Sequence, residues 1–190
     1  MNPATAARLH WLAPALSALW LAACATPAEP VGSERCYPRE NAAQCITQPP
    51  RPLGMLSDNF PVTVRVDARC EWNPSGVILQ RGARYRIKVT QVLEPWGDSW
   101  GGGSDLDGGS SGAFSFSGGF ARYWARAPEQ PMYALIGAQG REKRTFFVVG
   151  GEREFTADSG DELLFFANDW PGKYDDNRGC VELQVEKTSH

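Results

Sequence analysis

The stretch Arg84-Tyr-Arg-Ile-Lys-Val89 alternates basic and apolar side chains without interruption. Because successive side chains of a β-strand point to opposite faces, the apolar residues would lie on one face and the basic residues on the other. A strand of this kind belongs to an antiparallel sheet that packs one face on a core and exposes the other to water. The stretch therefore predicts a β-rich domain.

Short apolar or alternating runs, separated by turn residues, recur on both sides of this stretch. The runs are VTVRVDARC (62–70), GVILQ (76–80), RYRIKVTQV (84–92), MYALIGAQ (132–139), RTFFVVG (144–150), ELLFFAND (162–169) and CVELQVE (180–186). None has the length or the three-to-four spacing of an amphipathic helix, and the frequent turns are typical of sandwiches and barrels. We predict an all-β, jelly-roll-like β-sandwich over residues 62–187.

The N-terminus has the pattern of a processing segment. Arg8 precedes the apolar run WLAPALSALWLAAC, which is too short to span a bilayer comfortably, and Leu21-Ala-Ala-Cys24 resembles a bacterial lipobox. The resemblance implies removal of residues 1–23 and acylation of Cys24, while Ala25 favours delivery to the outer membrane. An ordinary secretory peptide or a membrane-anchored helix is the alternative.

Residues 24–61 read as an acylated, proline-rich tether. Seven prolines lie among polar residues between 25 and 61, without helical or strand periodicity. Such a segment would hold the sandwich clear of the membrane surface.

The cysteines predict disulfides. If Cys24 carries the lipid, four cysteines remain in an oxidising compartment, and four cysteines allow three pairings. We predict Cys36–Cys45, which closes a local loop, and Cys70–Cys180, which joins the first strand to the last. A four-thiolate metal site is the weaker alternative because the sequence has no C-x-x-C spacing.

Composition and histidine usage argue against two function classes. A net charge of -3 and a pI near 5.5, without a basic stripe, give no sign of nucleic-acid binding. The only histidines are His10, in the signal segment, and His190, so the G-x-S-x-G letters at Gly108–Gly112 have no histidine base. We predict that the chain is not an enzyme.

A glycosidase remains the enzymatic alternative, with Asp161 and Glu162 as the two carboxylates. These residues are adjacent, so within a strand they would point to opposite faces, which is wrong for a catalytic pair.

The segment Gly97–Gly119 is too long and too glycine-rich for a hairpin turn. Long loops are often functional, although an unimportant insertion has the same composition. Trp96 and Trp100 could stack on the apolar face of a sugar ring, or they could lie in the core.

The segment Asn168–Gly179, NDWPGKYDDNRG, gathers carboxylates and amides in one turn-rich stretch. The order of Gly82 before RYRIKV, then ALIGAQG, FFVVGG, ADSGDELLFFAND and PGKYDDNRG resembles the PA-I galactophilic lectin family over residues 62–187. That family consists of calcium-dependent, galactose-binding jelly-roll sandwiches. A solvated acidic loop without function is the alternative.

The resemblance implies a calcium site in this loop. Asp169 would supply a carboxylate, Lys173 its backbone carbonyl, and Asp176 and Asn177 their side-chain oxygens, with one further carbonyl from the loop after the RYRIKV strand. Calcium prefers six to eight oxygen ligands of these kinds. In such lectins two sugar hydroxyls complete the shell of the metal.

The same resemblance gives the sugar-binding candidates, which are Asp169, Trp170, Lys173, Asp176 and Gln130. The sequence departs from the family in three respects: Asp176 stands where an amide is usual, Asp175 replaces a small residue, and the family's sugar-contacting histidine has no counterpart. The preference for galactose is therefore not carried over.

The sequence predicts a lipid-anchored protein of the bacterial cell envelope, at the outer membrane, with a calcium-dependent carbohydrate-binding domain. The alternative is a structural or protein-interaction lipoprotein in which calcium only orders the loop. The related lectins oligomerise, but edge-strand pairing does not follow from one sequence.

Overall fold

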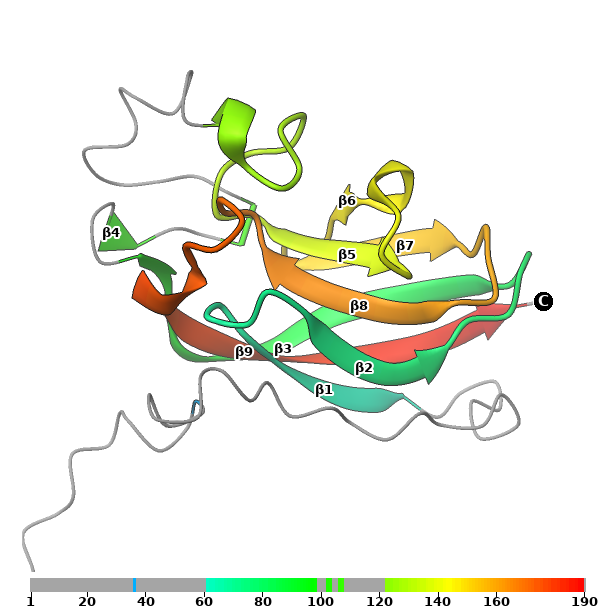
Figure 1. The fold of residues 1–190 in the computed structure, drawn as a ribbon. Coiled ribbons are helices and arrows are strands. Elements are labelled where there is room, and N and C mark those ends of the chain that lie inside the picture. Colours follow the sequence, from blue (N-terminus) through cyan, green and yellow to red (C-terminus); the bar gives the residue numbers. More distant parts are fainter. Residues whose placement is uncertain (1–35, 37–60, 99–101, 104–105, 108–121, 190) are drawn as a thin grey trace, which may run out of the picture. The chain divides into compact units, whose positions relative to one another are not determined.

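The structure is a computed structural model that describes residues 36, 61–98, 102–103, 106–107 and 122–189. Within these residues, two antiparallel sheets lie face to face as the two layers of a sandwich (Figure 1). The predicted all-β sandwich is confirmed.

Several predicted features lie outside the described residues. They are the signal segment 1–23, the lipidation site Cys24, Cys45, Trp100, the residues Gly108–Gly112, and all of the tether 24–61 except Cys36 and Pro61. They stay predictions. Where the chain is described, no helix is long and apolar enough to cross a membrane.

The larger sheet has five strands in the order β1-β9-β3-β4, and β7 also pairs with β3. Its strands are β1 (Val62–Asp67), β3 (Arg84–Asp98), β4 (Gly102–Gly103), β7 (Glu152–Thr156) and β9 (Asn177–Ser189). The long strands β3 and β9 pair over most of their length, with register shifts that mark bulges.

The smaller sheet has four strands in the order β2-β8-β5-β6. Its strands are β2 (Asn73–Ile78), β5 (Leu135–Gln139), β6 (Phe147–Val148) and β8 (Glu162–Ala167). Among the described residues, the strands are connected by the short 3₁₀ turns η3 (Arg122–Trp124), η4 (Lys143–Thr145) and η5 (Tyr174–Asp176). Figure 1 shows η3, β4 and η5 gathered at the same end of the sandwich.

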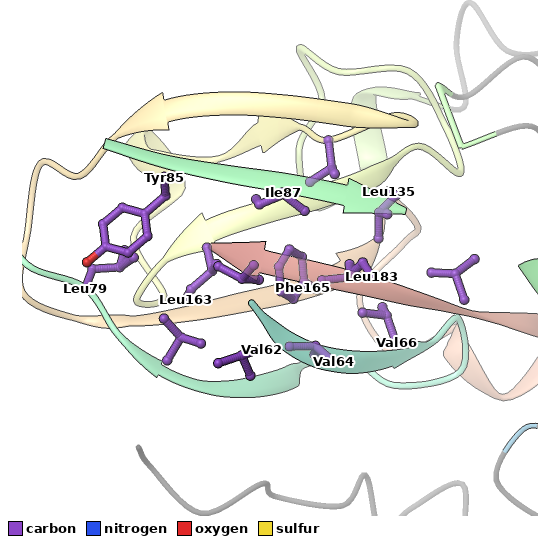
Figure 2. Close-up of a cluster of buried hydrophobic side chains, with 14 of the residues drawn as sticks. Val62, Val64, Val66, Leu79, Tyr85, Ile87, Leu135, Leu163, Phe165 and Leu183 are labelled. Carbon is purple, nitrogen blue, oxygen red and sulfur yellow. The ribbon is translucent and has the colours of Figure 1, made fainter. Parts of the chain in front are cut away.

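The core lies between the two sheets. Figure 2 shows Tyr85 and Ile87 of the larger sheet near Leu163 and Phe165 of the smaller one, all fully buried. The alternation of the opening stretch therefore places its apolar side chains in the core, as predicted. Burial of each such side chain contributes about 1.5–3 kcal/mol to stability.

Strand β7 has no counterpart among the predicted runs. Its sequence, EREFT, is mostly charged and exposed, and only Phe155 is half-buried. Phe155 stacks on Tyr85 with ring centroids 5.6 Å apart. The strand forms because β3 offers a free edge, and the sequence of an exposed edge strand carries little apolar periodicity.

The predicted disulfides are wrong. The structure contains Cys36–Cys180 with a Cα–Cα distance of 5.7 Å, and Cys70 is disulfide-bonded as well. Since Cys180 pairs with Cys36, neither Cys70–Cys180 nor Cys36–Cys45 forms. Cys180 lies opposite Asp67 in the β1–β9 register, and after Asp67 a turn leads the chain away from β9 to Cys70.

Cys36 also belongs to the sandwich rather than to a free tether. Its side chain is buried, and its sulfur is bonded to β9. This place of Cys36 could not be predicted, because the residues around it have no strand periodicity.

Candidate functional site

The acidic loop leaves β8 at Asn168 and enters β9 at Asn177. Its turn is built by Pro171 and Gly172, the second of which has a φ of 78°, a conformation that favours glycine. The Lys173 N–H donates to the Trp170 carbonyl at 3.1 Å and closes the turn. The loop is therefore bent back on itself, which directs its polar groups toward the end of the sandwich.

Asn168 fixes the loop to the segment 127–131. Its buried side-chain amide donates to the carbonyls of Ala127, Gln130 and Pro131 at 2.8–3.1 Å, and its oxygen accepts from the Ala127 N–H at 2.9 Å. A buried polar group that makes all its hydrogen bonds specifies one geometry. Asn168 thus positions Asp169, the next residue.

Asp169 is buried, and its carboxylate accepts from the Trp170 N–H at 2.7 Å. The pKa of Asp169 is raised to about 6, mainly by burial and also by the charges of Asp176 and Asp98, against hydrogen bonds from Trp170 and Asn177 that lower it. Burial, followed by the charge of Asp98, likewise raises the pKa of Asp176. Three carboxylates therefore share one region, and the charge of Lys173 offsets only part of the rise in the pKa of Asp176.

Asp98 is the member of this group that the sequence analysis missed. It is the last residue of β3, it is buried, and it lies opposite Asn177 in the β3–β9 register. The resemblance implies only a backbone carbonyl from the loop after this strand. The one signal in the sequence is an aspartate two residues after Trp96, at the start of a glycine-rich segment, and that signal is weak.

Tyr133 fixes the Asp98 carboxylate by donating a hydrogen bond from its hydroxyl. Its backbone carbonyl accepts from the indole N–H of Trp96 at 2.7 Å. Tyr133 has a φ of 59°, the left-handed conformation that costs a residue with a bulky side chain. Such backbone strain is held where the surrounding structure determines the geometry, and it clusters at functional sites.

Asn177 supplies an oxygen that lacks a partner. Its side-chain nitrogen donates to the Ala68 carbonyl at 3.1 Å, whereas its buried Oδ1 atom makes no hydrogen bond in the structure. A buried oxygen without a donor costs about 1–3 kcal/mol. A bound cation beside it would remove that cost.

The donor set fits calcium better than a transition metal. Over the described residues, no three His, Cys, Asp or Glu side chains converge closely enough to hold a metal by themselves. A cation at this end would therefore need amide and carbonyl oxygens besides carboxylates, and a mixed set of oxygen donors is the kind that calcium takes.

The structure brings most of the predicted residues together. Asp169, Lys173, Asp176 and Asn177 lie in or directly after the one loop, and Asp175 is exposed to solvent. Gln130 is different, because it lines a neighbouring hollow with Pro128 and Arg144, whereas Lys173 and Trp170 line another.

Two tryptophan side chains lie side by side at the acidic loop. Trp170 and Trp124 meet edge to face with ring centroids 5.7 Å apart, and Trp124 is 64% exposed. The exposed ring of Trp124 was not predicted. Trp96, which the sequence left open between sugar stacking and the core, lies in the core.

Arg126 joins η3 and the segment after it to the loop. Its backbone N–H donates to the Asp169 carbonyl at 2.9 Å, and its guanidinium lies 4.8 Å from the ring centroid of Tyr174. The same guanidinium forms an ion pair with Glu71 at 3.2 Å. Arg126 therefore holds two segments of the site together, and its charge is already balanced.

The carboxylates of the glycosidase alternative lie elsewhere. Asp161 is exposed before β8, and the Glu162 carboxylate accepts from the Gly76 N–H at 2.8 Å.

No family model and no curated protein matches the chain. Among solved structures, the N-terminal domain of EclA, a PllA-like lectin, is similar with a TM-score of 0.41 and 20% sequence identity. The match covers 66% of this chain and 94% of that one. The function of the site is therefore inferred from its own residues.

Proposed function

We propose that the sandwich is a calcium-dependent carbohydrate-binding domain of the kind found in the PA-I galactophilic lectins, and that its function is binding rather than catalysis. The ligands would be the carboxylates of Asp169 and Asp176, the side-chain oxygen of Asn177 and the carbonyl of Lys173. Asp98, whose carboxylate accepts from the Tyr133 hydroxyl, would add negative charge near these ligands.

The observation that carries the proposal is the buried, unpartnered Oδ1 atom of Asn177 at the end of an acidic loop. Burial and neighbouring negative charges, among them Asp98, raise the pKa values of Asp169 and Asp176, which makes the region favourable for a hard cation. Bound calcium would supply positive charge and open coordination positions for the hydroxyl groups of a sugar.

Trp124 and Trp170 support a saccharide as the ligand. The apolar faces of a sugar ring pack on aromatic rings, and these two rings lie beside Lys173, one of the predicted ligand residues. Trp124 and its neighbour Tyr123 are both exposed, and exposed aromatic residues that lie together favour a binding role.

The structural alternative, in which calcium only orders the loop, has less support. Hydrogen bonds of Asn168 and of the Arg126 N–H fix the start of the loop, and the Tyr174 hydroxyl donates to the Ala167 carbonyl at 2.9 Å. Because these bonds hold the loop by themselves, a cation would be free to serve a ligand.

We further propose that the domain is anchored to the outer membrane through acylated Cys24. The disulfides of Cys36, Cys70 and Cys180 support an oxidising compartment such as the cell envelope. The arm from Cys24 to Cys36 contains 12 residue steps (36 − 24), so it reaches at most about 40 Å. The domain would stay close to the membrane.

A glycan array tests the binding function. The purified full-length chain in detergent is applied in excess calcium and again with a chelator, beside the Asp169→Asn variant. We expect binding to a related set of glycans that disappears with the chelator and in the variant. Absence of binding by folded protein under both conditions would refute the lectin function.

A further inference from the structure

A groove extends from the acidic loop across the outer side of the four-stranded sheet. Its first part is lined by Trp124, Trp170, Pro171 and Lys173. The next part shares Trp124 and Pro171 with the first and has a volume of about 460 Å³, which is within the range of ligand-binding pockets. Because the parts share lining residues, they can hold successive units of one ligand.

The groove is lined with aromatic side chains. Besides Trp124, Tyr123 is 63% exposed, and Trp72 and Phe146 line the same hollow. Trp72 and Phe146 also pack on the outer apolar cluster of the smaller sheet, which makes the groove wall rigid. Flat, exposed rings on a rigid wall suit the stacking of sugar units.

The charges of the groove have one sign along most of its length. Lys173 lies at the end near the loop, and Arg141 and Lys143 lie further along, all exposed. The guanidinium of Arg141 lies 5.6 Å from the ring centroid of Trp72, which fixes it at the groove wall.

In the part of the chain that the structure describes, Arg141 and Lys143 form no ion pair with a carboxylate. Lys173 forms none either, but it lies near enough to Asp176 to lower the pKa of that carboxyl. Arg126 is paired with Glu71, and Arg144 with Glu142. Glu129 lines only the far hollow, beside Gln130.

The basic side chains of the groove are grouped together although the chain as a whole has a net charge of -3. A concave, aromatic surface that carries unbalanced positive charge on an acidic protein is complementary to an anionic ligand. Guanidinium and ammonium groups both bind carboxylate, sulfate and phosphate.

We propose that the ligand is an acidic saccharide, a chain whose sugars carry carboxylate, sulfate or phosphate groups. One unit binds at the acidic loop, and the following acidic unit lies against Trp124 with its negative group near Arg141 and Lys143. This inference rests on the proposed carbohydrate-binding function and names its substrate class.

The test uses an array that carries neutral glycans together with uronate-bearing, sulfated and phosphorylated ones. It compares the wild-type chain with Arg141→Gln/Lys143→Gln and with a control, Lys88→Gln/Arg153→Gln, in excess calcium. The control removes the same charge from exposed positions of the five-stranded sheet. Which acidic glycans are retained distinguishes the three anionic groups.

We expect the wild type and the control to prefer acidic glycans, and the groove variant to bind them at least 10-fold more weakly. The stabilisation of the variant by calcium, measured as the rise in melting temperature, should be unchanged. Equal binding of neutral and acidic glycans, or equal binding by the groove variant and the control, would refute the acidic ligand while leaving the lectin function in place. No binding to any glycan, with or without calcium, would refute both.

Discussion

Asn177 lies opposite Asp98 where β9 pairs with β3, and both side chains are buried. The last residue of the acidic loop and the last residue of β3 therefore meet at one end of the sandwich. This pairing places a further carboxylate near the candidate calcium site, one that the loop sequence alone does not contain.

The first prediction concerns Asp98. Asp98→Asn removes a buried negative charge near Asp169 and Asp176 while keeping the size of the side chain, so we expect calcium affinity to fall about 10-fold or more, the equivalent of about 1.4 kcal/mol. Calorimetric calcium titration measures the change. Asp158→Asn, an exposed residue elsewhere, is the control, and equal losses in the two variants would show that only overall charge matters.

Two neighbouring aspartates of the loop should behave differently. Asp176 is half-buried and senses the charge of Asp98, whereas Asp175 is exposed. Asp176→Ala is therefore expected to weaken calcium binding far more than Asp175→Ala, because an exposed charge is screened by water and salt. Equal calcium affinities of the two variants would contradict the ligand assignment.

Asp169 should lower the stability of the calcium-free protein and contribute to calcium binding. Burial and neighbouring carboxylates raise its pKa to about 6, so at pH 7.5 the calcium-free protein carries a disfavoured buried charge. Asp169→Asn removes that charge and keeps an oxygen for the Trp170 N–H. We expect the calcium-free variant to be more stable than the wild type by about 1 kcal/mol in urea unfolding.

The same unfolding experiment is repeated with calcium. The wild type should gain stability when calcium is added, and the variant should gain little, because a ligand stabilises only the state that binds it. A variant that is less stable than the wild type without calcium, or that gains as much as the wild type with calcium, would contradict the role of Asp169.

The ring of Trp124 should contribute to glycan binding but not to calcium binding. Trp124→Ala removes the exposed ring of the groove but leaves the acidic loop intact, so we expect glycan affinity to fall about 10-fold while calcium affinity is unchanged. Val92→Ala, another exposed apolar residue, is the control and lies on β3. Unchanged glycan affinity in the Trp124 variant would exclude stacking on this ring.

The disulfide between Cys36 and Cys180 should stabilise the sandwich. Its cysteines are 144 residues apart, and removal of a native disulfide typically costs about 2–5 kcal/mol. Cys36→Ser should therefore lower the unfolding free energy by about that amount. Peptide mapping of the wild type checks the pairing itself, because a fragment that joins Cys70 to Cys180 would contradict the structure.

The sequence predicted the fold well where its side chains alternate. Tyr85 and Ile87 are two residues apart and both lie in the core between the sheets. Burial of one face of a strand requires an apolar side chain at every second position, and the sequence shows this alternation. Strand β7 was not predicted, because an exposed edge strand is held by backbone hydrogen bonds to its neighbour. Such bonds impose little pattern on the side chains.

The sequence predicted the acidic loop but not its surroundings. Asp169 and Asn177 are close in sequence and remain close in the structure, whereas Asp98, Tyr133 and Trp124 reach the same end of the sandwich from distant strands and turns. Contacts of this kind depend on sheet register and loop paths. The pairing of Cys36 with Cys180 was missed for the same reason, since local spacing does not show which segment returns to β9.

Calorimetric titration of calcium into chelator-treated, full-length protein tests the central claim most directly. The account predicts one binding site per chain in the wild type, with heat that is lost in Asp169→Asn and a melting temperature that rises with calcium. Absence of calcium binding by folded wild-type protein, or an equal binding isotherm in Asp169→Asn, would contradict it.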